Sequence, residues 1–246
     1  MSASLKEGVI KITGIEALEV YPDFPEGAIK EGSRGQKGAT VFEDGNCTVG
    51  IWSSLPNKTN PLKFSYAEYM VILEGEVQIA HQLSGLTDSF KEGATFLIPA
   101  GMPFFWNQPS EIKKIYFVVE DISIDSHADE FKPINTLSTS SRVEKISNRT
   151  YHIVYQDKAA KFSAGKLLVS SLSTPLSHRQ QHELITPING SISIIYQKDS
   201  QQHVEHIHPG QSVFITAGTL VSITAKADEV TCSFAAAFIA SGVPKL

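Results

Sequence analysis

The sequence predicts an all-β fold made by tandem duplication of one small β domain. Short apolar segments rich in β-branched and aromatic residues recur along the chain, mostly bounded by Gly, Pro, Asn or Asp, as is typical of strands and turns. No stretch of ten or more residues has a convincing 3.6-residue periodicity, so helices are not expected. Short strands at regular spacing favour a sandwich or a barrel. The expected strands are 9–12, 40–42, 48–51, 69–73, 77–80, 95–98, 115–119, 151–155, 167–171, 192–196, 212–215, 220–224 and 231–238.

The duplication is visible in one spacing that occurs twice. Glu68 is followed by six residues and then Gly75, and Glu183 is followed by six residues and then Gly190, so both pairs are offset by 115 positions (183 − 68 and 190 − 75). The two glycines are expected to close tight hairpins, where a residue with a Cβ would be strained. Further matches, with offsets between 113 and 117, are Val41 with Val154, Gly50 with Gly165, and Gly93 with Gly210.

The length of 246 residues therefore corresponds to two related domains. We expect an amino-terminal barrel over residues 1–119, a crossing segment over 120–148 and a carboxy-terminal barrel over 149–246. The crossing segment is polar and rich in Ser and acidic residues, which is typical of a linker, with a short strand or turn near 131–134.

Composition excludes several classes of function. The formal net charge is −5, from 21 Lys+Arg and 26 Asp+Glu, and no basic patch indicates nucleic-acid binding. Two cysteines cannot form a disulfide framework or a zinc knuckle, so we expect buried free thiols. No apolar run approaches the ~18 residues of a membrane span, and the first residues lack the apolar core of a signal peptide. We therefore expect a cytoplasmic protein without membrane or nucleic-acid partners.

Two segments, EYMVILEGEVQI and EGATFLIPAGMPFFW, resemble the two motifs of the cupins. Those motifs are a histidine pair, then Glu, six residues and Gly, and later Gly, five residues, Pro-x-Gly, two residues and His. The segments are similar, more specifically, to the (S)-ureidoglycine aminohydrolase cupin domain family. The resemblance is strong over residues 41–119 and weaker over 154–238. It implies a bicupin, in which two jelly-roll barrels (double-stranded β-helices) form one chain.

The resemblance also implies a metal site, and its ligand positions can be compared one at a time. In the first barrel only the glutamate, Glu68, is a possible ligand. A divalent ion needs three or four protein ligands, so we expect no metal in this barrel. The other positions carry residues that do not ligate metals usefully: Pro61 and Lys63, or Leu62 and Phe64 in the alternative spacing, and Phe104.

The second barrel has two of the four ligand types. Glu183 holds the glutamate position and His178 matches one histidine, whereas the other two positions are Leu176 and Val221. His182 is adjacent to Glu183, and neighbouring strand residues point to opposite faces, so it is expected to turn away. We expect no native metal here, and manganese or zinc at His178 and Glu183 is the alternative.

Three histidines, His203, His206 and His208, form a second candidate cluster, since His-x-His on one strand face can bind nickel or zinc. The repeat aligns Ile207 with Phe90 on the core side. His206 and His208 are therefore expected on a solvated face, where only adventitious binding would occur.

Without a metal, the first barrel is expected to hold an apolar pocket with a few polar groups. The carboxylate of Glu68 could act as a general acid or base, or it could be paired with Lys63. Glu68 is the candidate catalytic residue, and a relic or structural role is the alternative. The candidate ligand-binding residues are Lys63, Tyr66, Met70, Phe104, Trp106, His178 and Glu183.

Two functional classes follow. The first is a bicupin of uncertain activity that binds a small polar metabolite in a barrel pocket that has lost most metal ligands. The alternative is a metal-dependent cupin enzyme that acts on a ureido or amino metabolite, as the ureidoglycine aminohydrolase resemblance implies. An ethanolamine-utilisation type cupin is a more distant alternative at the level of fold. The expected partner is a small-molecule ligand, and a homodimer is compatible with this organisation.

Overall fold

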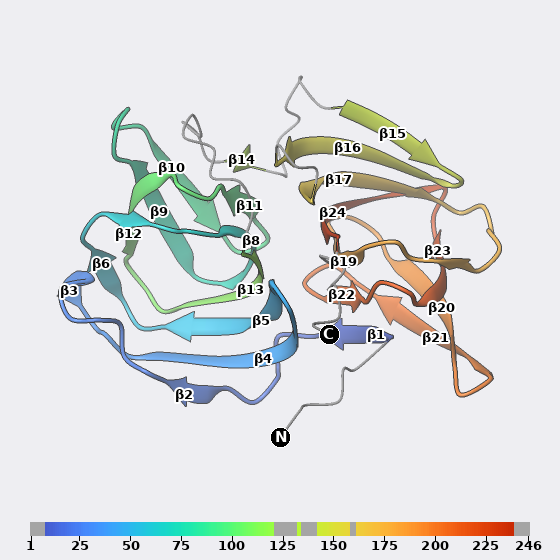
Figure 1. Ribbon diagram of the computed structural model, residues 1–246, viewed down its shortest axis with the longest axis horizontal. Helices are drawn as coiled ribbons and strands as arrows, with labels where there is room; N and C mark the ends of the chain where they lie inside the picture. Colours follow the sequence, from blue (N-terminus) through green and yellow to red (C-terminus); the bar gives the residue numbers. More distant parts are fainter. Residues whose placement is uncertain (1–7, 121–131, 134–141, 158–160, 239–246) are drawn as a thin grey trace, which may run out of the picture. The chain divides into compact units, whose positions relative to one another are not determined.

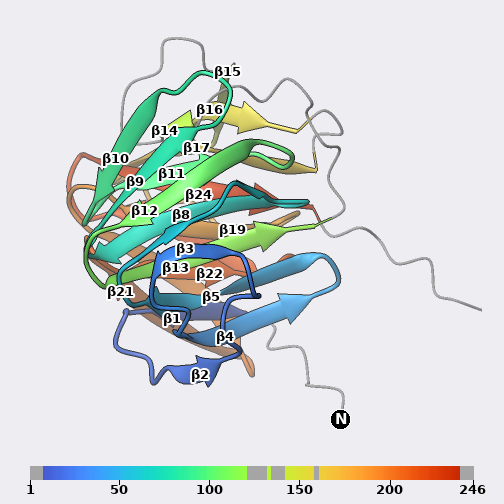
Figure 2. The ribbon, with the colours of Figure 1, turned by 90° about the vertical axis from the view of Figure 1, so that its left-hand side faces the viewer.

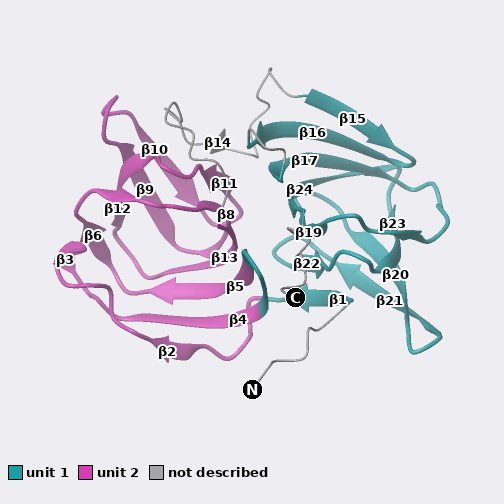
Figure 3. Cartoon of the chain, in the orientation of Figure 1, with its two compact units in different colours: residues 1–13, 42–47, 134–246 teal, residues 14–41, 48–133 magenta. Residues whose placement is uncertain are grey.

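The computed structural model describes residues 8–120, 132–133, 142–157 and 161–238 (Figure 1). Within these residues the chain forms strands and turns without helices, as the periodicity predicts. The described part of the chain accordingly holds no helix that is long and apolar enough to cross a membrane. The chain divides into two compact units (Figure 3). We call residues 14–41 and 48–133 the first barrel, and residues 1–13, 42–47 and 134–246 the second barrel.

The first barrel contains two antiparallel sheets, and residues 42–47, which join two of its strands, are counted with the second unit. The sheet with the order β14-β11-β8-β13-β5-β4-β2 consists of β2 (Glu19–Tyr21), β4 (Gln36–Asp44), β5 (Cys47–Ser54), β8 (Ala67–Glu74), β11 (Thr95–Ile98), β13 (Ile112–Val119) and β14 (Lys132–Pro133). In the other sheet, β10, β9 and β12 lie side by side (Figures 1 and 2). Its order is β10-β9-β12-β6-β3, with β7 paired to β12, and its strands are β3 (Ile29–Gly32), β6 (Asn57–Thr59), β7 (Leu62–Lys63), β9 (Glu76–His81), β10 (Thr87–Lys91) and β12 (Pro103–Gln108).

The second barrel also contains two antiparallel sheets. The larger has the order β1-β22-β19-β24-β17-β16-β15 and consists of β1 (Val9–Ile12), β15 (Arg142–Ile146), β16 (Arg149–Gln156), β17 (Phe162–Ser170), β19 (His182–Pro187), β22 (Ser212–Ile215) and β24 (Glu229–Ala237). The smaller has the order β18-β23-β20-β21 and consists of β18 (Ser177–His178), β20 (Ile192–Lys198), β21 (Gln201–Ile207) and β23 (Leu220–Ala225).

The two barrels repeat one strand order. The order β11-β8-β13-β5-β4 in the first barrel corresponds to β22-β19-β24-β17-β16 in the second. Glu68 in β8 and Glu183 in β19 occupy equivalent places, each opposite an isoleucine of the neighbouring strand, Ile98 or Ile215. The expected all-β tandem duplication of jelly-roll barrels is therefore confirmed.

The edges of the larger sheets differ from the boundaries expected from the sequence. Strand β1 was expected in the amino-terminal barrel, but it pairs with β22 of the second barrel, and β14 takes the equivalent edge beside β11 in the first. Strand β15 falls inside the expected crossing segment and pairs with β16. Residues 121–131 and 134–141 of that segment lie outside the described residues. An alternating pattern predicts that a strand forms, but not which open sheet edge it joins.

Glycines mark the passage from one sheet to the other. Gly75 has a φ of 84° and Gly190 a φ of 64°, a backbone region that favours glycine. A Cβ at Gly75 would also meet the carbonyl oxygen of Glu111. The strands on either side of Gly75, β8 and β9, belong to different sheets. The turn is therefore tight, as expected, but it connects two sheets and does not close a hairpin within one.

Candidate functional site

The interior of the first barrel carries a buried carboxylate, Glu68. It lies in β8 opposite Val118 of β13, and its exposed fraction is 6 %. Side chains alternate between the faces of a strand, so Met70 and Ile72 project from the same face, and both belong to the apolar core of this barrel. Glu68 therefore projects into the barrel, where it lines a cavity.

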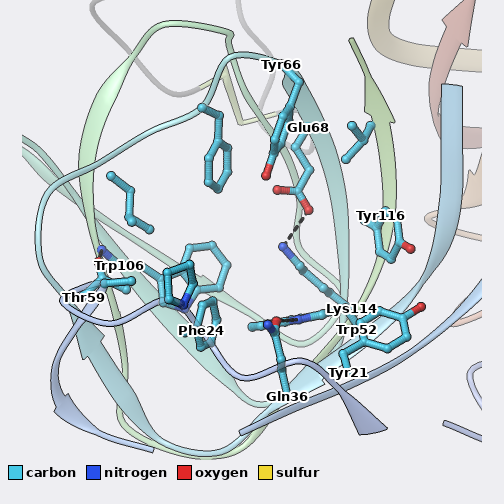
Figure 4. Close-up of a pocket in the computed structure, with 15 residues that line it drawn as sticks. Tyr21, Phe24, Gln36, Trp52, Thr59, Tyr66, Glu68, Trp106, Lys114 and Tyr116 are labelled. Atoms are coloured by element: carbon cyan, nitrogen blue, oxygen red, sulfur yellow. Dashed lines mark hydrogen bonds and ion pairs between the residues drawn. The ribbon is translucent and has the colours of Figure 1, made fainter. Parts of the chain in front are cut away.

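The partner of Glu68 is Lys114 of β13. Its Nζ donates to Oε1 of Glu68 at 2.7 Å (Figure 4), and the two side chains are 8 % and 7 % exposed. The register between β13 and β8 shifts between Lys113 and Lys114, and such irregularities re-aim side chains. The adjacent Lys113 consequently has a different partner, with its Nζ 3.7 Å from Oε1 of Glu74. Lys114 therefore places a cation inside this barrel.

Two tryptophans surround the ammonium group. Nζ of Lys114 lies 4.8 Å from the ring centroid of Trp52 and 5.0 Å from that of Trp106, within the range of cation–π attraction. The indole N–H of Trp52 donates to Gln36 Oε1 at 2.8 Å, and that of Trp106 donates to Gln108 Oε1 at 2.7 Å. These hydrogen bonds fix the two rings, so the cation is held by a carboxylate and two oriented aromatic faces.

A cavity of about 460 Å³ opens beside this ion pair (Figure 4). Its size is within the range of small-molecule sites, and seven of its fifteen lining residues are aromatic. Burial and the negative charges of Glu68 and Glu120 raise the pKa of Tyr66, so its phenol is a neutral hydrogen-bonding group. Burial likewise raises the pKa of Tyr116 to about 12. The lining residues are Tyr21, Phe24, Pro25, Ala28, Gln36, Trp52, Thr59, Leu62, Phe64, Tyr66, Glu68, Trp106, Lys114, Tyr116 and Val118.

The structure brings together only some of the residues expected in this pocket. Glu68, Tyr66 and Trp106 line the cavity. Met70 and Phe104 are fully buried in the core cluster and are not among the lining residues. These two side chains lie behind the residues that line the cavity. Sδ of Met70, for example, lies 3.2 Å from Nζ of Lys114.

Lys63 is not the partner of Glu68, and this expectation is corrected by the structure. Lys63 is exposed in β7, opposite Pro103, and does not line the cavity. Lys114 was missed because the expected strand began at residue 115. A sequence signal was present, since Lys114 is in phase with Tyr116 and Val118 in a strand whose alternate positions share a face.

The residues of the first barrel do not fit the metal site that the cupin resemblance implies. At the expected ligand positions, Glu68 is the only group that can coordinate a metal, and the Lys114 ammonium already binds its carboxylate. Across the described ranges, no group of three or more His, Cys, Asp or Glu side chains could hold a metal ion. In this barrel the ammonium group of Lys114, and not a set of metal ligands, lies beside the glutamate.

The equivalent glutamate of the second barrel, Glu183, has cations nearby. Its Oε1 lies 3.7 Å from Nη1 of Arg179, and its exposed fraction is 7 %. Burial raises the pKa of Glu183 to about 7, and the positive charge of Arg149 opposes this rise. Arg149 was not identified from the sequence, because it is far from Glu183 along the chain.

His178 and Glu183 do not form the expected pair of metal ligands. His178 is exposed in β18, in the smaller sheet, and its Nδ1 lies 2.8 Å from the carbonyl oxygen of Gly218, whereas Glu183 is buried in the larger sheet. His178 instead borders a separate depression of about 850 Å³ that Tyr196 also lines. The described donors do not fit the manganese or zinc site considered as the alternative.

His182, the neighbour of Glu183 in β19, has structural partners of its own. The ring of His182 packs against Phe42 and Phe214, away from Glu183, as expected from strand alternation. Burial lowers the pKa of His182, and the charge of Asp44 opposes this effect.

His203 and His206 lie in β21, and His208 directly follows this strand. His206 and His208 are exposed, and their Nδ1 atoms lie 3.0 Å from Ser193 Oγ and 2.7 Å from Ser191 Oγ, respectively. The expected solvated position of this pair is confirmed. His203 stacks on Tyr196 instead.

Comparison with known proteins adds a family match for part of the chain. Residues 41–116 match the family model of the EutQ-like cupin domain. This range holds the Glu68 motif and Lys114. No curated protein sequence matches the chain.

Several solved structures are similar to the whole chain. A protein of unknown function of the DUF861 family from Pseudomonas syringae pv. tomato is 16 % identical with a TM-score of 0.70, covering 94 % of this chain and 100 % of its own. A putative glyoxylate-induced protein from Pseudomonas aeruginosa is 10 % identical with a TM-score of 0.60, covering 96 % and 91 %. HEPD from Streptomyces albus, with its substrate 2-hydroxyethylphosphonate and Fe(II) bound, is 8 % identical with a TM-score of 0.61, covering 94 % and 76 %.

At these identities the likenesses concern the fold alone. They agree with the strand order repeated in the two barrels and with the domain match over residues 41–116. Together these findings show a EutQ-like cupin domain match over residues 41–116 and a fold that is similar to the solved structures over the whole chain.

Proposed function

We propose that the first barrel binds a small organic molecule through the Lys114–Glu68 pair, without a metal at the usual cupin position. The observation that carries this proposal is the 2.7 Å ion pair, buried between two tryptophans at the edge of a 460 Å³ cavity. A buried ammonium group in this position provides a fixed positive charge for a ligand. In a cupin with a metal site, the metal ion would provide that charge.

The contacts of Lys114 favour a ligand with an oxygen acceptor. An ammonium has three N–H donors; one binds Glu68 and a second points to the sulfur of Met70. The third is available for a carbonyl or carboxylate oxygen in the cavity. The second oxygen of Glu68 can accept from an N–H of the same ligand. A ureido group offers both a carbonyl oxygen and N–H donors, and the aromatic walls suit an apolar body attached to it.

The ureidoglycine aminohydrolase resemblance supports the same ligand class. It also implies metal-dependent chemistry, for which the described donors of neither barrel are suitable. We therefore propose ureido or amino acids as ligands and leave the catalytic role of Glu68 as a prediction.

Fluorescence titration tests this proposal, because both tryptophans of the chain, Trp52 and Trp106, line the cavity. N-carbamoyl amino acids with side chains from glycine to phenylalanine are the probes. We expect a saturable change in emission, and we expect Lys114→Met to weaken binding about tenfold or more by removing a charged hydrogen bond. The control Lys113→Met should bind like the wild type.

If Lys114→Met does not fold, the double variant Lys114→Met/Glu68→Gln removes the pair without leaving one charge buried. No saturable change with any probe would contradict the proposal. Equal affinity of the wild type and either Lys114 variant would also contradict it.

A further inference from the structure

A second cluster of buried charges lies in the second barrel, and it is not balanced. Arg149 and Arg179 are each 6 % exposed, and Glu183 and Tyr151 are each 7 % exposed. Arg149 is in phase with the core positions Tyr151 and Ile153 of β16. Arg149 and Tyr151 lie opposite Val169 and Leu167, which belong to the core cluster of this barrel. Strand partners share a face, so Arg149 projects into the interior.

Glu183 projects into the same interior. It is opposite Ile215 and Ala236, and both belong to the same core cluster. Arg149 acts electrostatically on both Glu183 and Tyr151. Arg179 reaches Glu183 from the segment between β18 and β19. The interior of this barrel therefore gathers two guanidinium groups around one carboxyl group.

Most donors of these guanidinium groups lack a protein acceptor among the described residues. Arg149 donates from Nη1 to the hydroxyl of Tyr151 at 3.0 Å. Arg179 has only the 3.7 Å approach of Nη1 to Glu183, and its buried Nε has no hydrogen-bond partner, nor has Oε2 of Glu183. Two guanidinium groups carry about ten N–H donors. One hydrogen bond and one long ion pair are a small fraction of this capacity.

An uncompensated buried charge is costly, and native proteins pair such charges or bind counter-ions. In the first barrel Lys114 and Glu68 balance one to one. In the second barrel two arginines face one carboxyl group. Guanidinium groups present parallel N–H donors that match the oxygens of carboxylate and phosphate.

We propose that Arg149 and Arg179 form a binding site for a compact oxyanion, a carboxylate or phosphate group, beside Glu183 in the second barrel. This site is independent of the proposed ligand site of the first barrel, since it is built from different residues in a different compact unit. Its ligand is an anion alone or the acidic group of a larger metabolite.

Isothermal titration calorimetry of the full chain tests the site, with sodium acetate and sodium phosphate as separate probes. Sodium chloride at matched ionic strength is the reference. We expect saturable binding of acetate or phosphate at one site per chain, and the tighter probe identifies the chemical class. Arg149→Met and Arg179→Met should each weaken binding about tenfold or more. The control Arg142→Met should bind like the wild type, because Arg142 is an exposed arginine of the same sheet, 65 % exposed and paired with Glu144.

The double variant Lys114→Met/Glu68→Gln serves as a second control, and its affinity for the anion should be unchanged. If the methionine variants do not fold, Arg149→Lys and Arg179→Lys keep the charge but lose the paired donors, and they should still weaken binding about tenfold. No saturable heat beyond the chloride reference would mean that water alone hydrates the arginines, and the proposal would be wrong. Equal affinity in the wild type and the Arg149 and Arg179 variants would reveal an adventitious ion elsewhere. Loss of binding in Lys114→Met/Glu68→Gln would assign the anion to the first barrel.

Discussion

Nζ of Lys114 lies 2.7 Å from Oε1 of Glu68 inside the first barrel, with both side chains less than one-tenth exposed. The glutamate that the cupin resemblance assigns to a metal is thus neutralised by a cation of the same chain. This relationship changes the chemistry of the pocket, because the charged group next to the cavity is a hydrogen-bond donor with fixed direction.

Removing one member of this pair should destabilise the protein strongly. Lys114→Met leaves Glu68 buried without a counter-charge, so we expect a loss of about 3–5 kcal/mol in the free energy of unfolding. The double variant Lys114→Met/Glu68→Gln should recover much of this loss. Urea denaturation followed by tryptophan fluorescence reports on this barrel, since both tryptophans lie there.

The matched control is Lys113→Met, which removes a more exposed lysine that lies 3.7 Å from Glu74. It should change stability by less than about 1 kcal/mol. A Lys114→Met variant that is as stable as Lys113→Met would show that the pair does not hold the charge of Glu68.

The buried Glu183 should make stability depend on pH. Burial raises its pKa in the folded protein to about 7, above the ordinary value of 4.5. Between these values the folded state binds a proton that the unfolded state has released, so the contribution of Glu183 to stability is full below about pH 4.5 and is lost as pH rises to about 7. This rise in the pKa of Glu183 corresponds to a change of at most about 3 kcal/mol in the free energy of unfolding.

Glu183→Gln lacks this titration. The difference in unfolding free energy between Glu183→Gln and the wild type should therefore grow in favour of the variant from pH 5 to pH 8, as measured by circular dichroism in urea. The exposed Glu229→Gln is the control and should show a constant difference. A constant difference for Glu183→Gln as well would contradict the buried, proton-binding state.

The two cysteines should be unreactive in the folded protein. Burial raises the pKa of Cys232 to about 12, and burial together with the charge of Asp44 raises the pKa of Cys47 to about 12. The thiolate is the reactive form, so Ellman's reagent at pH 8 should titrate neither thiol in buffer and both in denaturant. Rapid reaction of one thiol in buffer would show that its site opens to solvent.

Two glycines with similar backbone conformations should differ in their tolerance of a methyl group. Gly75 and Gly93 have φ values of 84° and 81°, and a left-handed residue costs about 1–2 kcal/mol without glycine. A Cβ at Gly93 meets nothing within 4 Å, whereas one at Gly75 meets the backbone of Glu111. Gly75→Ala should therefore be at least about 1 kcal/mol less stable than Gly93→Ala in urea denaturation. Equal stabilities would mean that the turn at Gly75 relaxes freely.

The repeat and the alternating pattern predict much of the fold. The spacing from Glu68 to Gly75, found again from Glu183 to Gly190, correctly identified the duplication and the equivalent central strands. The edge strands could not be assigned, because β1 joins β22 through backbone hydrogen bonds that any extended segment can form. Residues that are far apart in the sequence become strand or side-chain partners only once the barrel has closed, so the sequence pattern alone does not identify them.

The candidate sites were predictable only in part. Glu68, Tyr66 and Trp106 follow from the motifs, and they line the cavity. Lys63 was chosen for its nearness in sequence, but the partner of Glu68 comes from 46 residues away. Arg149 and Glu183 have no common motif, and only the pairing of β16, β17, β24 and β19 brings them to one interior.

Metal analysis of purified protein decides whether Lys114 or a metal ion is the cation beside Glu68 in the first barrel. The protein is left untagged, because a histidine tag would add metal of its own. We expect a content well below one divalent ion per chain after growth in metal-supplemented medium and dialysis, with no change in Glu68→Gln. About one equivalent of a divalent metal in the wild type that is lost in Glu68→Gln would contradict a barrel in which Lys114 is the resident cation.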